Sequence, residues 1–359
     1  MLTTDSAGPR RSVTAEFDDP DDARRAAHAA SVVAPVRLDC DGRPLPGLAV
    51  AWSRDTSALF WTLQLGDSPV AESGAVWTAG TLAAAWRADP AAAAALRLAG
   101  VESLLPLDER RLVVGFSARE PALPTVFADR SLGVAPSVPP SDSLVPRQPP
   151  SGDLRDAIDG ATDLVHTSDP ELLEYAGHRP GLTAVALPWD RAYLLLLPQG
   201  SAGVGAAIPP DTSAFRASLA RDAVQADARG AASTSWWTET GSCRRSPPPV
   251  APPPTGAIVY RAADRVARGL AERIVALAGA PAPTAHGLDD DAFPRALLAG
   301  SARAYVVAAP VHPTVPCRES AEWPAGATAI PLIETRPHAI LRRGVPPLAV
   351  EWDGAVVTR

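Results

Sequence analysis

Hydrophobic and polar residues alternate along the chain with two different periods, which together predict a mixed α/β fold. Alternate apolar side chains over residues 58–65 predict a strand with one buried face: Leu59, Trp61, Leu63 and Leu65. Apolar side chains spaced by four, four and three residues predict a helix with one buried stripe: Val266, Leu270, Ile274 and Leu277. The strand–helix–strand order over residues 256–308 predicts that its two strands pair in parallel.

Local signals define the ends of several elements. Residues 19–30 predict a helix with an acidic first turn. Thr78 or Thr81 can cap a second helix, which starts near these threonines. Residues 90–100 begin with proline and end with glycine, which is typical of a complete helix. Residues 182–198 predict two strands or one hairpin. The proline-rich segment 136–150 predicts a linker, since proline removes a backbone donor from helices and central strands.

Composition narrows the functional classes. The 359 residues are 46% hydrophobic and carry a net charge of −7 without a basic stripe, so we expect no nucleic-acid partner. We find neither a membrane span nor an apolar segment after the N-terminal arginines. Either an export signal has been removed or the protein stays in the cytoplasm. Cys40, Cys243 and Cys317 form no C-x-x-C pair, and a Cys243–Cys317 disulfide would need an oxidising compartment.

The sequence offers no complete set of catalytic residues. The glycines after residue 199 form no full G-x-G-x-x-G motif, and Pro209-Pro210 prevents the helix that would bind phosphate. The histidines form no HxH or HxxxH group: His28, His166, His178, His286, His312 and His338. We therefore predict a protein that is not an enzyme, with no catalytic residue, no metal site and no cofactor.

The order of several short motifs resembles one known family. Residues 42–52 carry a glycine, a Pro-x-Leu-Ala stretch and a tryptophan: Gly42, Pro46, Leu48, Ala49 and Trp52. "FWTLQL", the Thr78-Ala79 helix start, "VESLLPLDERRLVVGFSAREPAL", "LRDAIDGATDLVHTSDPELLEYAG" and "FRASLARDAV" then follow. In this order they resemble the peptide, oligopeptide and nickel-binding family (family 5) of extracytoplasmic solute-binding proteins of ABC importers.

The resemblance implies an α/β, two-lobed periplasmic-binding-protein-like fold with mixed sheets. It places lobe I at residues 1–245, including the linker 136–150, and lobe II at 255–310, as a strand, two helices and a strand. Residues 311–359 would be strands that return to lobe I. The chain is shorter than the family, so we expect a reduced fold without the sub-domain that would lie between Val134 and Asp153. No acidic residue precedes Glu319 in the second lobe's expected binding loop, which argues against recognition of a free α-amine.

A cleft between lobes needs aromatic walls and a few placed polar groups. The candidates are two aromatic segments: Trp189, Asp190, Arg191 and Tyr193, and then Trp236 and Trp237. Adjacent tryptophans in a strand cannot both face one core, so one faces the ligand or both pack against the prolines that follow. Asp190 and Arg191 equally suit a solvated turn, whereas Trp52, Trp61 and Trp86 suit a core.

These residues and the resemblance predict a monomeric, periplasmic or extracytoplasmic solute-binding protein of an ABC-type transporter. It would bind a peptide-like or other small polar solute in the interlobe cleft and deliver it to the importer's membrane permease. The alternative is a degenerate relative that senses or scaffolds and takes no part in transport, and that stays in the cytoplasm if no export signal was removed.

Overall fold

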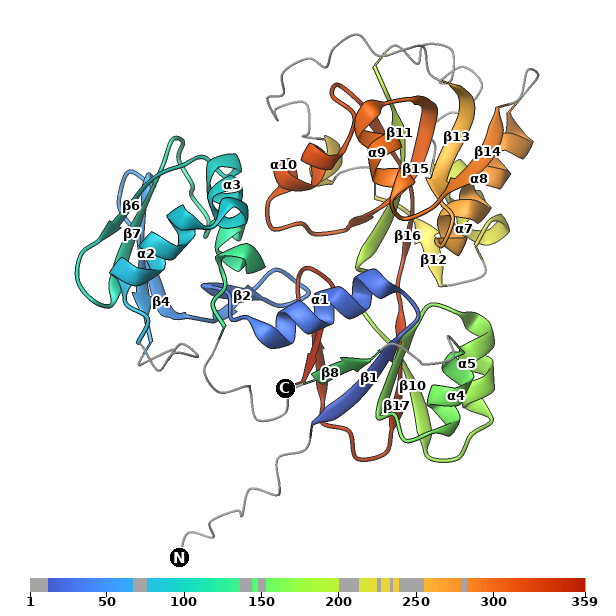
Figure 1. Ribbon diagram of the computed structural model, residues 1–359, viewed down its shortest axis with the longest axis horizontal. Coiled ribbons are helices and arrows are strands. Elements are labelled where there is room, and N and C mark those ends of the chain that lie inside the picture. The colour runs from blue at the N-terminus through green and yellow to red at the C-terminus, as the bar shows by residue number, and fades with distance from the viewer. Residues whose placement is uncertain are drawn as a thin grey trace, which may run out of the picture. The chain divides into compact units, whose positions relative to one another are not determined.

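The computed structural model describes residues 12–66, 76–135, 144–147, 153–199, 213–224, 227–232, 235–238, 255–278 and 283–358. It divides the chain into two compact units, each with its own sheets (Figure 1). Unit 1 comprises residues 1–167, 171–187 and 338–359, and unit 2 comprises residues 168–170 and 188–337. Both units contain parallel and antiparallel strand pairs, which confirms the predicted mixed α/β class.

Unit 1 is built on a five-stranded sheet in the order β10-β17-β9-β1-β8. Its strands are β1 (Val13–Phe17), β8 (Leu144–Arg147), β9 (Leu164–Thr167), β10 (Leu182–Ala186) and β17 (His338–Arg342). β1 pairs in parallel with β8 and β9, whereas β17 runs antiparallel to β9 and β10. The last strand of this sheet in sequence therefore lies between two strands formed more than 150 residues earlier.

Helices cover both faces of this sheet. Neighbouring residues of β9 point to opposite sides and pack against different helices. Leu164 packs in the cluster that contains α1 (Pro20–Ser31), and Val165 packs in the cluster of α4 (Leu154–Asp159) and α5 (Pro170–Gly177). The hairpin of β18 (Leu348–Val350) and β19 (Val356–Thr358) contributes Val356 to the first cluster. α1 confirms the helix predicted over residues 19–30, with Asp19 as its N-cap.

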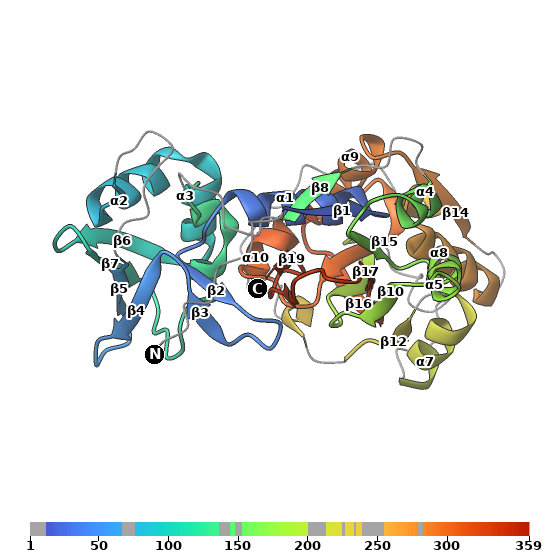
Figure 2. The ribbon, with the colours of Figure 1, turned by 90° about the horizontal axis from the view of Figure 1, so that it is seen from below.

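A second sheet of unit 1 has the order β4-β5-β7-β6 and carries two helices on one face (Figure 2). Its elements are β4 (Ala49–Arg54), β5 (Phe60–Leu65), α2 (Ala79–Ala88), α3 (Pro90–Leu98), β6 (Val101–Pro106) and β7 (Arg111–Phe116). Trp61, Leu63 and Leu65 are buried, as their alternation predicts. Thr78 and Thr81 both cap α2, in a reciprocal capping box.

The stretch before this sheet forms the short pair β2 (Val36–Leu38) and β3 (Pro44–Pro46) around a tight turn. Gly42 has a φ of 78°, and a Cβ there would lie 2.3 Å from the Trp352 ring. Both facts require glycine at this position. Beyond β7 the chain forms two 3₁₀ turns, η1 (Thr125–Ala128) and η2 (Arg130–Leu132).

Unit 2 is built on a six-stranded sheet in the order β12-β16-β11-β15-β13-β14. The strands are β11 (Arg191–Leu197), β12 (Ala228–Gly230), β13 (Thr255–Arg261), β14 (Thr284–Leu288), β15 (Ala302–Pro310) and β16 (Thr328–Thr335). β13 and β15 pair in parallel, as their strand–helix–strand order predicts. β14 extends the sheet at one edge.

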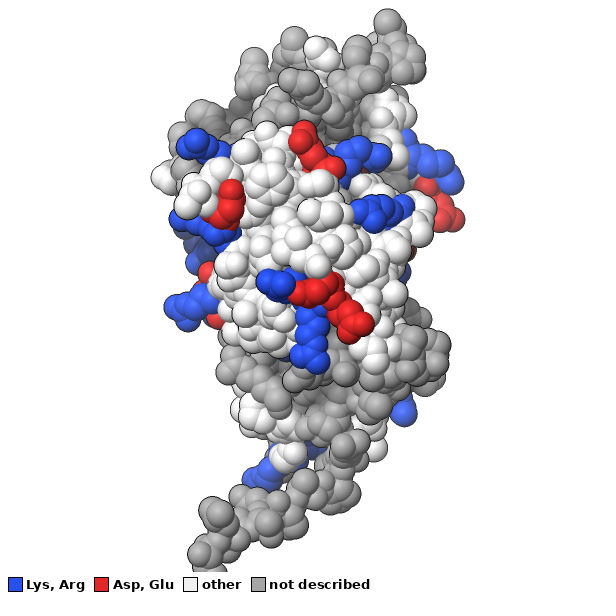
Figure 3. Space-filling model, turned by 90° about the vertical axis from the view of Figure 1, so that its left-hand side faces the viewer, with Lys and Arg blue, Asp and Glu red and all other residues white. Residues whose placement is uncertain are grey.

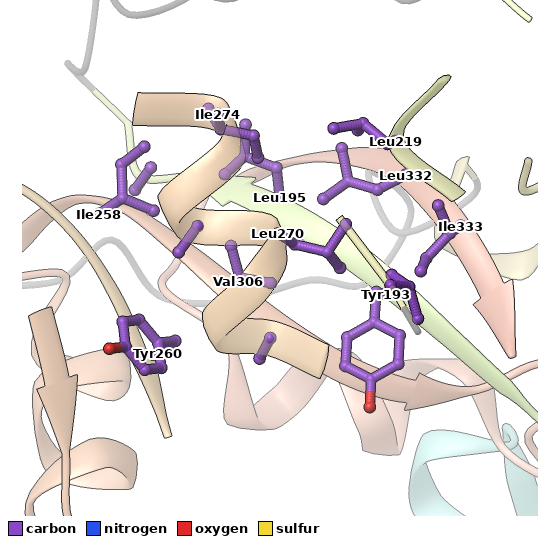
Figure 4. Packing of buried hydrophobic residues seen from close by; sticks show 14 of the residues in the cluster. Tyr193, Leu195, Leu219, Ile258, Tyr260, Leu270, Ile274, Val306, Leu332 and Ile333 are labelled. Carbon is purple, nitrogen blue, oxygen red and sulfur yellow. The ribbon is translucent and has the colours of Figure 1, made fainter. Parts of the chain in front are cut away.

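Two cores lie on opposite faces of the unit 2 sheet. Tyr193 and Leu195 of β11 pack with α7 (Ser213–Asp222) and α8 (Arg265–Leu277), where Leu270 and Ile274 face the sheet (Figure 4). Ala192, Leu194 and Leu196 pack on the other face, with α9 (Ala292–Ala299) and residues of η3 (Trp236–Thr238). α10 (Pro316–Glu319) and η5 (Ser320–Glu322) precede β16.

The division into units differs from the predicted lobe boundaries. The prediction assigned residues 188–245 to lobe I, but β11 lies at the centre of the unit 2 sheet, between β15 and β16. Of the C-terminal strands, β16 belongs to unit 2, and the return to unit 1 begins at His338. The two strands predicted over residues 182–198 form, but β10 and β11 lie in different sheets and do not make a hairpin.

Part of the proline-rich segment 136–150, which was predicted to be a linker, forms a strand. Leu144–Arg147 forms β8, which pairs with β1 at the edge of the sheet. Pro146 is compatible with this strand because an edge strand leaves one side without a ladder partner. The rest of that segment, the second proline run at 246–254 and the glycines at 200–205 lie outside the described residues.

Candidate functional site

The candidate site is an aromatic and charged cluster in unit 2, where β11 begins and β16 ends. Trp189 lies two residues before β11 and is half-buried. The Arg229 guanidinium carbon lies 4.4 Å from the centroid of the Trp189 ring, and that of Arg336 lies 4.9 Å from it. Both distances are within the range of cation–π contacts.

Strand pairing explains why these side chains meet. Arg229 of β12 stands opposite Glu334 of β16, and its Nε donates to Glu334 Oε2 at 2.7 Å. Arg336 follows the end of β16, and its Nε donates to Asp227 Oδ2 at 2.8 Å. Each guanidinium that covers Trp189 is therefore held in place by its own carboxylate.

Glu334 is the buried anchor of the cluster. Its side chain is 3% exposed, and its second oxygen accepts a hydrogen bond from the Ala232 backbone N–H at 3.2 Å. A buried carboxylate needs such a complete set of partners, because an isolated charge is costly to bury. Burial lowers the pKa of nearby His312, although the charge of Glu334 acts in the opposite direction. His312 is therefore neutral at neutral pH.

The chemistry of the cluster is that of recognition. An aromatic ring offers a flat apolar surface, and the half-exposed side chain of Arg229 has N–H groups beyond those that contact Glu334. Two arginines and two carboxylates balance in charge: Arg229, Arg336, Asp227 and Glu334. A balanced set of donors and acceptors around an aromatic wall suits a small polar or zwitterionic solute.

The six residues predicted for the site do not lie together. Trp189, Asp190 and Arg191 are consecutive at the start of β11, and the Val311 N–H donates to the Asp190 carbonyl at 2.9 Å. Tyr193 is 2% exposed in the core beside α8, and its hydroxyl donates to Asp264 Oδ1 at 3.2 Å. Trp236 and Trp237 lie in the core on the opposite face of the sheet.

The tryptophan pair has a packing role within unit 2. Trp237 is 1% exposed, and the rings of Trp236 and Trp237 meet edge to face with centroids 5.8 Å apart. Trp236 also contacts the Trp323 ring and donates from Nε1 to the Pro310 carbonyl at 2.9 Å. Their 3₁₀ turn lets both rings face one core, which the expected strand geometry did not allow. Trp61 and Trp86 are buried as predicted, whereas Trp52 is only half-buried.

Comparisons with known proteins identify the fold. No family model matches the sequence, and no curated protein matches it. Solved structures do match. The AgaA binding protein of A. tumefaciens R10, in complex with agropinic acid, superposes with a TM-score of 0.66 at 10% identity over 93% of this chain and 94% of its own. NikZ of Campylobacter jejuni, in complex with Ni(L-His), superposes with a TM-score of 0.66 at 10% identity over 97% of this chain and 98% of its own.

The murein tripeptide binding protein MppA of Escherichia coli also gives a TM-score of 0.66 at 10% identity, over 93% and 94% of the two chains. The chain has the fold of the family 5 solute-binding proteins. This confirms the resemblance in fold that the sequence motifs predict. At this identity the ligands of the three neighbours belong to those proteins, which take an opine, a nickel chelate and a tripeptide.

On the face of this solute-binding-protein fold seen in Figure 3, charged side chains of both signs lie singly or in small groups among uncharged residues. Among the described residues, no helix is both long and apolar enough to cross a membrane.

Sequence reasoning missed Arg229, Glu334, Arg336 and Asp227. The signal for two of them was present, since an apolar strand ends in Glu-Thr-Arg-Pro at residues 334–337. Arg229 and Asp227 follow no pattern of their own and become recognisable only through the pairing of β12 with β16. The predicted absence of a metal site stays a prediction, although Asp18, Asp22 and His166 of unit 1 each offer a potential ligand atom within 4.8 Å of the others.

Proposed function

We propose that this protein is the solute-binding component of an ABC-type importer and binds a peptide-like or other small polar solute without transforming it. The observation that supports this most strongly is the match, over 93–97% of the chain, to solved binding proteins whose ligands are a tripeptide, an opine and a nickel chelate. The same neighbours support a protein that is not an enzyme. The partner would be the importer's membrane permease, and the protein would act as a monomer.

Within unit 2, we propose that the solute contacts Trp189 and the guanidinium groups of Arg229 and Arg336. The ring would pack against the apolar part of the solute, and the guanidinium groups would bind a carboxylate or carbonyl oxygen. Because Asp227 and Glu334 already fix both arginines, little side-chain entropy is lost on binding. This cluster replaces Tyr193, Trp236 and Trp237 as the centre of the proposed site.

The proposal is tested by titrating the protein with short peptides and small carboxylated solutes, following tryptophan fluorescence and the melting temperature. We expect at least one compound to change the fluorescence and to raise the melting temperature, since a ligand that binds only the folded state stabilises it. The Arg336→Gln variant should bind that compound at least tenfold more weakly, which corresponds to about 1.4 kcal/mol. Trp189→Phe should remove most of the fluorescence change.

Arg268→Gln is the matched control, because Arg268 of α8 is also an exposed arginine paired with a carboxylate, that of Glu272. It should bind like the wild type. An equal loss in both arginine variants would contradict the site. No response to any compound, together with no retained small molecule in native mass spectrometry of freshly purified protein, would contradict the function.

Transport is tested separately. Cells that lack the gene should lose uptake of the bound solute, and the wild-type gene should restore it. Binding in vitro combined with unchanged uptake would favour a sensor or scaffold.

A further inference from the structure

We propose that Asp18, Asp22 and His166 bind a divalent transition-metal cation, with Zn²⁺ as the reference ion. The three residues belong to unit 1, whereas Trp189 and Arg336 of the proposed solute site belong to unit 2. One potential ligand atom from each lies within 4.8 Å of the other two. The proposal does not rest on the proposed solute-binding function.

The parallel pairing of β1 and β9 brings the three side chains together. Phe17 of β1 stands opposite His166 of β9, and the backbone N–H of Asp18 donates to the His166 carbonyl at 3.1 Å. Asp18 follows the end of β1 directly, and Asp22 lies in the first turn of α1, which begins at Pro20 (Figure 1). The cluster therefore lies at the carboxyl ends of two parallel strands, the usual position of ligand sites in α/β sheets.

The buried Nδ1 atom of His166 is the feature that points to a ligand. The His166 side chain is 1% exposed, and its Nδ1 has no hydrogen-bond partner, although it lies 3.5 Å from Asp22 Oδ2. A buried ring nitrogen without a hydrogen bond is unfavourable, because its interaction with water has been lost and not replaced. A cation between Nδ1 and the carboxylates would satisfy this nitrogen and use both acidic groups.

Neighbouring side chains already orient the two carboxylates. Arg25 binds Asp22 Oδ1, which leaves Oδ2 on the side of His166. The hydroxyl of Thr167 donates to Asp18 Oδ2 at 2.8 Å. Hydrogen bonds of this kind fix the first ligands of a metal and are needed for affinity. Asp18 is exposed, so an ion can enter from solvent and water can complete its coordination.

The donor set favours a transition metal over Ca²⁺ or Mg²⁺. Those two ions prefer oxygen donors alone, whereas one imidazole with two carboxylates suits Zn²⁺, Co²⁺ or Ni²⁺. Metal–ligand bonds of about 2.1 Å place two ligands of one ion at most about 4.2 Å apart. The potential ligand atoms lie within 4.8 Å of one another, so the distances between them would shorten by up to roughly half an ångström when the ion binds.

The test starts from protein stripped of metal with a chelator. ZnCl₂ is titrated by calorimetry, and CoCl₂ is titrated by visible absorption, which reports a nitrogen and oxygen ligand field directly. We expect one ion per chain at this site and a higher melting temperature with Zn²⁺. His166→Gln and Asp18→Asn should each weaken Zn²⁺ binding at least tenfold and change or remove the cobalt spectrum.

Two matched controls are present in unit 1. His178→Gln changes an exposed histidine, and Asp21→Asn changes the carboxylate next to Asp22; both should bind Zn²⁺ like the wild type. Asp18→Asn covers the case in which the buried His166 variant fails to fold, since Asp18 is exposed. Wild-type affinity in a folded Asp18→Asn variant, or equal loss in the controls, would overturn the proposal. So would stability that responds to pH but not to Zn²⁺ or Co²⁺, since His166 and Asp22 would then form a proton-dependent pair only.

Discussion

At the scale of single residues, Arg130 of unit 1 pairs with two carboxylates at once. Its side chain is 12% exposed, and it donates from Nε to Asp353 Oδ2 at 2.6 Å. Its Nη2 also donates to Glu351 Oε2 at 2.5 Å, and Glu351 accepts a second bond from Arg37 Nε. The C-terminal hairpin is thus held to residues more than 200 positions earlier by one nearly buried network.

This network predicts a pH-dependent loss of stability in Arg130→Met. Burial raises the pKa of Asp353, but the charge and hydrogen bonds of Arg130 outweigh burial and hold that pKa below its ordinary value. A carboxyl with a lowered folded-state pKa adds stability above its unfolded pKa, near 4, and loses it as the pH falls further. At pH 7 we expect a loss of about 3 kcal/mol, because the variant removes a nearly buried arginine that pairs with Asp353 and is one of the two arginine partners of Glu351.

The loss is measured by urea denaturation between pH 3 and pH 8. It should shrink as the pH falls below about 4, because protonation of Asp353 then removes the charge that pairs with Arg130. Arg43→Met is the control: Arg43 pairs with Asp41 on the surface, where both side chains are more than half exposed. That variant should show no measurable change. A loss that stays constant across this pH range would contradict the role assigned to Arg130.

Residue-level prediction from the sequence succeeded where local chemistry decides and failed where tertiary contacts decide. Thr78 and Thr81 cap α2 as predicted, because a cap depends on a few neighbouring residues. The aromatic candidates Tyr193, Trp236 and Trp237 were chosen by type. Their placement in two cores depends on which side of β11 each contacts, and nothing near them in the sequence specifies that.

At the scale of elements, α8 shows how a stripe of apolar positions becomes a buried face. Leu270 and Ile274 are 0% exposed against the sheet, whereas Leu277, one turn further on, is 38% exposed. The predicted spacing is therefore correct for the middle of the helix and too long at its end. α8 ends at Leu277, so that side chain has no following turn to cover it.

Leu270→Ala and Leu277→Ala form a matched pair on this helix. We expect Leu270→Ala to lower the free energy of unfolding by about 3 kcal/mol, because it removes buried methyl groups and leaves a cavity. Leu277→Ala should cost less than about 1 kcal/mol, since much of its side chain already contacts water. Chemical denaturation of both variants measures the difference, and equal losses would show that α8 packs differently.

Several helices and strands were predictable from periodicity and caps, but their assignment to sheets was not. β8 was read as linker because prolines surround it, and its pairing with β1 depends on a contact across 130 residues. β10 and β11 are four residues apart, yet they belong to different sheets because their partners, β17 and β15 with β16, lie far along the chain. The loss of a sub-domain between Val134 and Asp153 stays a prediction.

At the scale of the whole molecule, the cysteines bear on where the protein works. Cys317 is in a disulfide and Cys40 is free. Cys243, with which Cys317 could pair in an oxidising compartment, lies outside the described residues. Disulfides persist mainly in oxidising compartments. The bond therefore supports the proposal of a periplasmic or other extracytoplasmic location.

Cysteine labelling checks this proposal. Protein from its native cells is alkylated under denaturing conditions, with and without prior reduction, and is weighed by mass spectrometry. We expect one labelled cysteine before reduction and three after it, because the chain has three cysteines and only Cys40 is free among the described ones. Three labels without reduction would argue for a reducing compartment.

The position of β17 has a consequence for how the chain is made. Its residues, His338–Arg342, sit between β9 and β10, which the ribosome completes some 150 residues earlier. Until these late residues have been synthesised, the nascent chain carries β10 separated from the rest of its sheet, so this unit matures only after translation is nearly over. Such a delay leaves the edges of β9 and β10 without their common neighbour while the residues between β10 and β17 are being made.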